Sequence, residues 1–307
     1  MNGASVRSSG PSPLPTRSAA PVWLAFTPGV FVFLWATGFI GARLSADDAE
    51  PFSFLAIRFA IVAAVLAVAA LAAGAPWPNR RAAGHALVVG ALMHGGYLGG
   101  VFWSIAQGLP AGVSALIVGL QPLLTALFAA PFLGERISAR HWLGLGIGIL
   151  GVALVVGPRF TFGDHGITPL TVAGSTLATL SITLGSIYQK RHMTGLDLRS
   201  GNAVQFLGAT VVVAIAAVVS ERFHITWTGE VIFAMAWLVL VLSIGAITLL
   251  YLMIRHGEVS RIAGLFYLVP AVTAALAWLL FGETLSPVQI LGMAVSAAAV
   301  MLVTRRA

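Results

Sequence analysis

Runs of about 20 consecutive apolar residues recur along this chain and constrain its fold more than any other feature. A helix of that length spans the roughly 30 Å hydrocarbon core of a bilayer. Helices satisfy their own backbone hydrogen bonds in lipid, whereas a membrane barrel requires alternating segments of about ten residues, which this sequence lacks. With 58% hydrophobic and 9% charged residues, the chain is predicted to be an all-α integral membrane protein.

Charged residues and Pro/Gly clusters divide the chain into ten predicted transmembrane helices. Their approximate limits are 22–42, 52–73, 86–106, 113–133, 141–157, 168–189, 199–220, 231–254, 261–281 and 286–304. Residues 1–21 are rich in Ser and Pro and are predicted to form a disordered cytoplasmic tail. The first apolar run is too long for a signal-peptide core, so we expect it to be a retained span.

Basic residues are distributed unevenly over the predicted loops. With the N-terminus inside, 13 of the 17 Lys and Arg residues fall on the cytoplasmic side, and only Arg43, Arg159 and Arg222 fall outside. Cytoplasmic loops of membrane proteins carry such an excess. The sequence therefore predicts a multi-pass protein of the cytoplasmic (inner) membrane with both termini in the cytoplasm.

The chain contains an internal repeat. A shift of 148 residues places "ALIVGLQPLLTALFAAPFLGERIS" over "AGLFYLVPAVTAALAWLLFGETLS" without a gap, and it aligns Pro122 with Pro270 and Glu135 with Glu283. The predicted repeats are residues 22–157 and 168–304. Because each repeat has five spans, an odd number, the second must be inverted relative to the first. Inverted repeats are typical of alternating-access transporters, whose sites lie near the bilayer midplane between the repeats.

Several motifs resemble a known family. "FLWATGFIGARL" in the first span, "PFSFLAIRFA" at the start of the second and the paired "LGER" and "FGET" blocks are similar to those of EamA-type transporters of the drug/metabolite transporter superfamily. The resemblance covers residues 22 to 304. It implies ten helices, export or exchange of small metabolites such as amino acids, a cavity lined mainly by spans 1, 3, 4, 6, 8 and 9, and supporting roles for spans 5 and 10.

His94 is predicted to lie near the bilayer centre, within the glycine-rich stretch "GALMHGGYLGGVFWS". Ionisable groups at that depth usually face an interior or a water-filled cavity. Tyr97 follows on the same helical face. The pair either lines a substrate cavity, with His94 as a proton carrier, or packs as a neutral core pair. Glycines four residues apart favour close packing against a neighbouring helix.

Arg58 is predicted to lie inside the second span. It either attracts an anionic substrate or pairs with an acid of the outer loop, and the structural role is favoured. Gln121 precedes Pro122 in the fourth span, where proline removes a backbone donor and kinks the helix. Pro270 is the matching kink in the second repeat, and matched interruptions indicate a transporter site.

Three aromatic residues complete the predicted cavity. Tyr267 lies close to Pro270, Trp35 lies deep in the first span, and Trp103 lies near the end of the third. Aromatic residues near helix ends also form interfacial belts, so Trp35 and Trp103 have that alternative role.

Other kinds of chemistry are disfavoured. The chain has no cysteine, which excludes disulfides and thiolate ligands. The predicted spans carry no mid-depth Asp or Glu, metal-ligand cluster or phosphate-binding loop, so no cofactor or metal is expected. Basic residues are too dispersed for nucleic-acid binding. The expected partners are a small-molecule substrate, lipid and, if transport is coupled, protons. A membrane enzyme or a non-transporting scaffold remains the alternative function. Gly144 and Gly148 allow packing within a monomer or between two chains.

Overall fold

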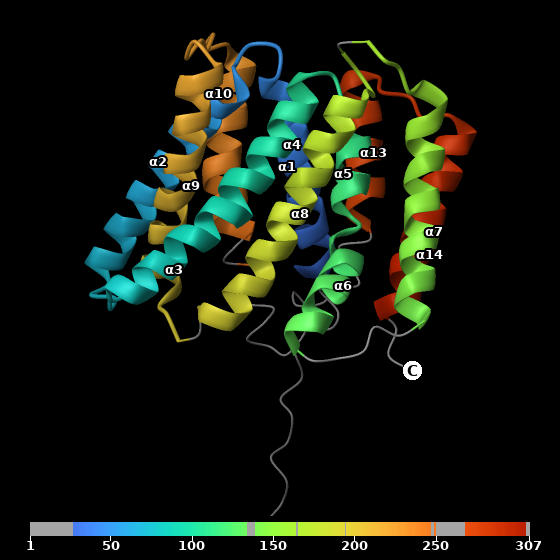
Figure 1. The fold of residues 1–307 in the computed structure, drawn as a ribbon. Helices are drawn as coiled ribbons and strands as arrows, with labels where there is room; N and C mark the ends of the chain where they lie inside the picture. Colours follow the sequence, from blue (N-terminus) through green and yellow to red (C-terminus); the bar gives the residue numbers. More distant parts are fainter. Residues whose placement is uncertain are drawn as a thin grey trace, which may run out of the picture.

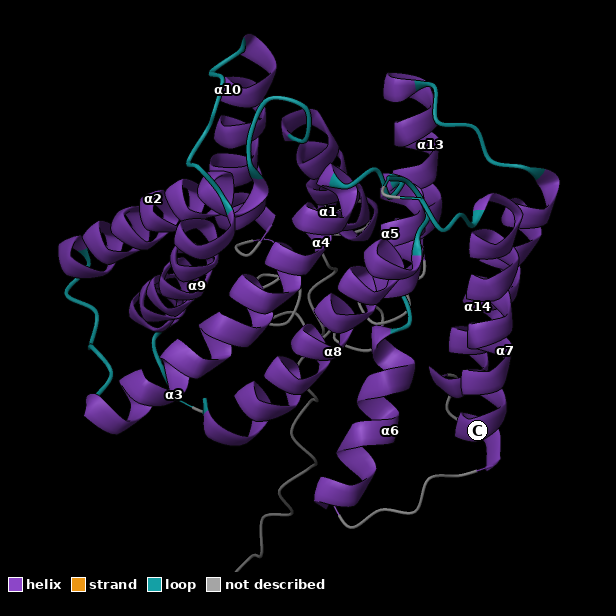
Figure 2. Ribbon diagram, turned by 45° about the horizontal axis from the view of Figure 1, so that its top comes forward, coloured by secondary structure: helices purple, strands orange, loops and turns teal. Residues whose placement is uncertain are grey.

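The structure is a computed structural model that describes residues 27–133, 139–163, 165–193, 195–246, 249 and 268–304. Every regular secondary-structure element within these ranges is a helix, and the helices form one bundle (Figure 1, Figure 2). Five of these described helices are long and apolar enough to span a bilayer, and five shorter apolar helices accompany them. The prediction of an all-α, ten-span membrane fold is therefore confirmed.

Several spans are built from more than one helical segment. In chain order the helices are α1 (Thr27–Ser45), α2 (Pro51–Ala72), α3 (Arg80–Gly90) with η2 (Ala91–Gly96) and α4 (Tyr97–Ala106), α5 (Ala111–Val118) with α6 (Gln121–Leu133), α7 (Ala139–Val156), α8 (Pro169–His192), α9 (Leu198–Ser220), α10 (Gly229–Ala236) with η4 (Trp237–Ala246), α13 (Val269–Phe281) and α14 (Pro287–Thr304).

The third span begins earlier than the predicted residue 86. Helix α3 starts at Arg80, and the side chain of Asn79 caps it by accepting a hydrogen bond from the backbone N–H of Ala82 at 2.9 Å. The first turn carries Arg80 and Arg81, whose charges lower the local hydropathy. For that reason the hydropathy pattern placed the start of the span too late in the sequence. Long basic side chains at a helix end extend to the polar interface, so a transmembrane helix tolerates them there.

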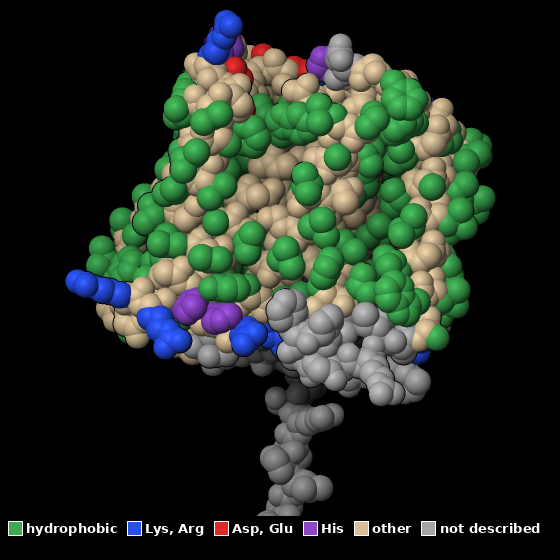
Figure 3. Space-filling view, viewed as in Figure 1, with side chains coloured by type: hydrophobic (Ala, Val, Ile, Leu, Met, Phe, Trp, Pro, Cys, Tyr) green, Lys and Arg blue, Asp and Glu red, His purple; other side chains and the backbone are tan. Residues whose placement is uncertain are grey.

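The two ends of the bundle differ in charge. We call one end the acidic face, which carries Asp47, Asp48, Glu50, Glu221 and Glu283, and the other the basic face, which carries Arg80, Arg81, Lys190, Arg191 and Arg199. Figure 3 shows the acidic side chains at the top, where a basic side chain and His side chains also lie, and further Lys, Arg and His side chains near the bottom. Helix α1 ends at the acidic face, whereas its repeat equivalent α8 begins there (Figure 1). The repeats are therefore inverted, as predicted.

Equivalent spans of the two repeats pack against each other. Helix α2 packs on α9, α5 on α13 and α7 on α14. The α7–α14 pair lies at one edge of the bundle in both ribbon views (Figure 1, Figure 2). The third span packs on α8, and α10 with η4 packs on α1. This arrangement brings α1, the third span, α8 and η4 together around the middle of the bundle.

Two π-helical segments occupy matching positions in the repeats. Segment η2 contains His94, and the shift of 148 residues places it onto residues 239–244, within η4. A π turn is wider than an α turn and is frequent at functional sites. The third and eighth spans are therefore irregular at the same depth.

The fourth and ninth spans also match. Helix α5 ends at Val118, and α6 starts at Gln121, with Pro122 as its second residue. Helix α13 starts at Val269, with Pro270 as its second residue. Proline is tolerated in a first helical turn, where its missing N–H would have no helical partner. Both prolines thus begin a helical segment, and the two segments lead to opposite ends of the bundle (Figure 1).

Glycines in η2 and α4 allow close contact with α8. A Cβ atom added at Gly100 would lie 2.9 Å from both the Ala178 Cβ and the Gly174 carbonyl oxygen. One added at Gly96 would collide with Ser181, whose hydroxyl donates a 2.9 Å hydrogen bond to the Leu92 carbonyl. The close helix approach expected from the glycine spacing is therefore present.

Candidate functional site

A cavity of about 100 Å³ lies between the two repeats. Four of the predicted site residues line it: Trp35 from α1, Arg58 from α2, His94 from η2 and Tyr97 from α4. The remaining lining residues are Gly38, Phe39, Met93, Leu98, Val101, Phe102, Ile182, Phe206, Leu242 and Ser243. The cavity therefore has largely apolar walls with a small number of polar groups, as small-molecule sites usually do.

The helices that line this cavity differ from those expected. Its residues come from spans 1, 2, 3, 6, 7 and 8, so α2 and α9 replace spans 4 and 9 within the described ranges. The close packing of α2 on α9 explains this, because it turns Arg58 and Phe206 inward beside the third span.

Tyr97 and His94 are held differently. Tyr97 is 5% exposed, and its hydroxyl is hydrogen-bonded with the side chain of Trp35. The His94 ring stacks on Phe206, with ring centroids 4.3 Å apart and an interplanar angle of 10°. Within the described ranges His94 makes no hydrogen bond. Its ring nitrogens are therefore available to a molecule in the cavity.

Arg58 does not pair with the acids of the outer loop. Its side chain is 2% exposed, and one terminal nitrogen donates to the Ser243 hydroxyl at 3.1 Å and to the Leu238 carbonyl at 3.4 Å. The guanidinium carbon lies 5.6 Å from the Phe59 ring centroid and 6.0 Å from that of Phe102. The expected ion pair to Asp47, Asp48 or Glu50 is thus replaced by neutral partners on η4 and by aromatic faces.

Two predicted residues do not line this cavity, and a third cannot be assigned to it because it lies outside the described residues. Trp103 is not among the cavity residues and packs against Gly174 of α8. It follows His94 by nine residues, which is roughly two and a half helical turns. Trp103 therefore lies on a different side of the helix from His94. Gln121 begins α6 and does not line the cavity. Tyr267 lies outside the described residues.

Ser243 and Phe206 are site residues that sequence reasoning missed. Ser243 is a polar residue within the apolar stretch "WLVLVLSIGA", and that contrast was an available signal. Phe206 had none, because one phenylalanine on an apolar helix resembles any other.

A second cavity has a volume of about 610 Å³. It lies among α5, α13 and α14, and its lining includes Pro270, the 61% exposed Trp278 and the 57% exposed Ile290. Exposed apolar side chains on a transmembrane bundle face lipid, so this cavity is a lateral groove on the lipid side. The smaller cavity, with its buried polar groups, is the stronger candidate for a solute site.

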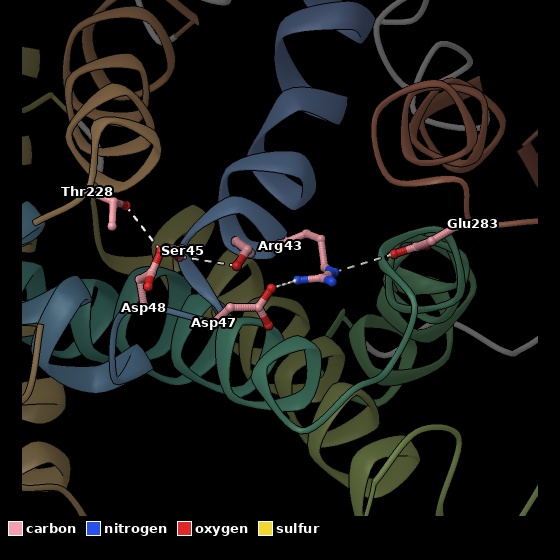
Figure 4. Close-up of polar contacts among 7 residues, drawn as sticks. Arg43, Ser45, Asp47, Asp48, Thr228 and Glu283 are labelled. Carbon is pink, nitrogen blue, oxygen red and sulfur yellow. Dashed lines mark hydrogen bonds and ion pairs between the residues drawn. The ribbon is translucent and has the colours of Figure 1, made fainter. Parts of the chain in front are cut away.

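Polar contacts join the repeats on the acidic face (Figure 4). Arg43 lies 2.9 Å from Asp47 and 3.8 Å from Glu283, and the Thr228 hydroxyl donates to Asp48 at 3.1 Å. Burial raises the pKa of the Glu283 carboxyl, while Arg43 and the backbone N–H of Ala111 partly oppose that shift. These contacts link α1 and the loop after it to the start of α10 and to the residues that follow α13.

The Glu50 and Glu221 carboxylates make reciprocal contacts on the same face. Glu221 accepts hydrogen bonds from the backbone N–H groups of Phe52 and Ser53 at the start of α2. Glu50 accepts from the backbone N–H groups of Arg222 and His224. In the part of the chain that the structure describes, no group of three His, Asp or Glu side chains is placed to hold a metal ion.

Comparison with known proteins gives consistent matches. A sequence model of the EamA-like transporter family matches residues 22–157 and again residues 170–305. The chain is 28% identical over 272 residues to the uncharacterized inner membrane transporter YedA of Escherichia coli (strain K12), which covers 88% of this chain and 87% of that protein. It is 27% identical over 280 residues to the aromatic amino acid exporter YddG of Ancylobacter novellus, covering 85% and 88%. A solved crystal structure has a TM-score of 0.62 at 22% identity, covering 93% of this chain and 99% of that chain, and shares the fold.

Proposed function

Because this chain belongs to the EamA-like transporter family of the drug/metabolite transporter superfamily, we propose that it exports amino-acid-like metabolites by alternating access of its two repeats. It is a transporter and not an enzyme. The observation that carries the proposal is the cavity between the repeats, in which Trp35, Arg58, His94 and Tyr97 meet apolar walls. The amino acid exporter among its relatives supports the substrate class.

The size of the cavity bears on the transport cycle. A volume of about 100 Å³ is below the roughly 300–1,000 Å³ of most ligand sites. An amino-acid-sized substrate therefore requires the surrounding helices to separate. The irregular segments η2 and η4 adjoin the cavity, and rearrangement of their wide turns would provide that movement.

The chain is proposed to be a multi-pass inner membrane protein, as its relative in Escherichia coli is named. The basic face is assigned to the cytoplasm because cytoplasmic loops carry excess Lys and Arg. Both termini would then be cytoplasmic, and the acidic face would lie on the outside. Gly148 packs internally, since an added Cβ atom would lie 2.9 Å from Leu123; this favours a monomer over a homodimer through that surface.

His94 is the proposed proton carrier if export is proton-linked. It lines the cavity and lacks a hydrogen-bond partner in the described ranges. A change in its protonation state would therefore change its charge and its hydrogen bonding toward a bound substrate.

The test is transport by purified protein in proteoliposomes. We expect preloaded vesicles to exchange radiolabelled phenylalanine or leucine, with protein-free vesicles as the blank. His94→Ala should lose most of this exchange, while His165→Ala, which alters an exposed histidine, should retain it. Equal exchange by His94→Ala and wild type would remove His94 from the site, and absence of exchange for every amino acid would overturn the substrate class.

A further inference from the structure

We propose that Arg58 is an anion-binding site that holds the carboxylate of the transported molecule, so that substrates require an acidic group. This inference rests on the proposed function, because it concerns the same cavity. Arg58 is 2% exposed, and its Nε and second terminal nitrogen are buried without a partner in the described residues.

A buried guanidinium of this kind is costly in free energy. Removing a charge from water carries a penalty of several kcal/mol, which only a counter-ion or full hydrogen bonding offsets. Its protein partners, Ser243 and the Leu238 carbonyl, are neutral and engage one nitrogen. The aromatic faces of Phe59 and Phe102 add weaker cation–π attraction. The other two nitrogens remain donors without acceptors.

The described part of the chain does not supply the missing negative charge. No Asp or Glu lines the cavity there, and nearby acids are engaged on the acidic face. Asp47 and Glu283 contact Arg43, while Glu50 and Glu221 accept backbone N–H groups. A ligand that enters the cavity is therefore the natural source of the counter-ion, and a carboxylate matches the donors of a guanidinium.

The other walls define the rest of the ligand. Phe39, Phe102, Ile182, Phe206 and Leu242 are apolar and favour a hydrocarbon or aromatic group. The described lining offers no acid for an ammonium group. The geometry thus favours hydrophobic carboxylates and disfavours amines that lack an acidic group.

The first experiment compares four matched probes on wild-type protein by thermal shift and isothermal titration. Phenylalanine and 3-phenylpropionate retain the carboxylate, whereas phenylalaninamide and phenethylamine lack it. We expect the two carboxylates to bind about tenfold more tightly or better, as for a hydrogen bond to a charged group. Equal binding of all four would overturn the inference while leaving the proposed function intact. Binding of inorganic phosphate alone would overturn the carboxylate assignment, and no binding of any probe would overturn the proposed function itself.

The second experiment uses variants. Arg58→Gln should lose the preference for carboxylates, and Arg58→Lys should keep part of it because the positive charge remains. Arg222→Gln is the matched control, since it removes an exposed arginine side chain on the acidic face. The melting temperature of each variant reports folding. Retention of the full preference in a folded Arg58→Gln would overturn the inference.

Discussion

The Nε atom of Arg43 lies 3.8 Å from the Oε1 atom of Glu283, and this ion pair joins the end of α1 in the first repeat to the end of α13 in the second. Arg43 also stacks over Phe281, with its guanidinium carbon 5.3 Å from the ring centroid. In the proposed alternating-access cycle these two ends would separate when the acidic face opens. The pair is therefore a contact that the proposed cycle would break.

The stability of this closed arrangement should depend on the protonation of Glu283. Burial raises the pKa of its carboxyl above the ordinary 4.5, so the folded chain holds the proton more tightly than the unfolded chain. The neutral carboxyl stabilises the fold at low pH, and this contribution is lost as the pH rises from the ordinary value through the raised one. Melting temperatures across that window should fall more for wild type than for Glu283→Gln. Glu230→Gln, an exposed acid of the same face, should follow wild type; parallel curves for wild type and Glu283→Gln would contradict the prediction.

Gly100→Ala should destabilise the bundle. The new methyl group would lie 2.9 Å from the backbone oxygen of Gly174, and such overpacking costs about 1–3 kcal/mol. Gly84→Ala is the control, because it lies in α3 with no atom within 4 Å of an added Cβ and should gain roughly 0.5–1 kcal/mol from helix propensity. Thermal unfolding in detergent distinguishes the two. A neutral Gly100→Ala would show that α4 and α8 can move apart freely.

Ser243→Ala should weaken both stability and substrate binding. It removes the 3.1 Å acceptor of Arg58, which leaves a buried charged donor less satisfied, at a cost of roughly 1–3 kcal/mol. Ser104→Ala is a matched comparison, because the Ser104 hydroxyl is buried without a partner in the described ranges and its removal should be nearly neutral. Titration with phenylalanine and melting temperature provide the measurements. Equal effects of the two substitutions would argue against a positioning role for Ser243.

The hydrogen bond between Trp35 and Tyr97 should appear as a coupling energy. Tyr97→Phe and Trp35→Phe each remove it, so the double variant should cost less than the sum of the single ones, by about 1 kcal/mol. Unfolding free energies of the four proteins give the cycle. Strict additivity would show that the hydrogen bond adds nothing to stability.

The orientation can be measured directly, because the chain has no native cysteine. Thr161→Cys places a thiol on the acidic face and Lys190→Cys places one on the basic face, both at exposed positions. In intact cells a membrane-impermeant maleimide should label only the first. The reverse pattern would place the termini outside.

Hydropathy and the internal repeat predicted the ten spans and their inversion. The spans follow from local composition, and the inversion follows from the odd number of spans in each repeat. They also selected Trp35, Arg58, His94 and Tyr97, which the structure brings to one cavity. Which helices pack against each other was harder to predict, because the packing of α2 on α9 depends on how the side chains of both helices fit together along the whole interface. For that reason Phe206 was missed, and Trp103, a candidate for the cavity wall, is not among the residues that line the described cavity. The π turns were also invisible, because an extra residue in a turn leaves no compositional mark.

The unpaired state of Arg58 has an electrical consequence. With no counter-ion in the described chain, an empty site carries one positive charge. A carboxylate that lacks an ammonium group, such as 3-phenylpropionate, would neutralise that charge, whereas a zwitterionic amino acid would leave the site with one positive charge. A charge that crosses the full membrane field changes in energy by about 2.3 kcal/mol per 100 mV. For a carboxylate without an ammonium group, an interior-negative potential would draw the empty carrier back toward the cytoplasm and leave the loaded carrier almost unaffected, so current should accompany its export. For a zwitterionic amino acid the two forms carry the same charge, so no net current should accompany its export under the proposed mechanism.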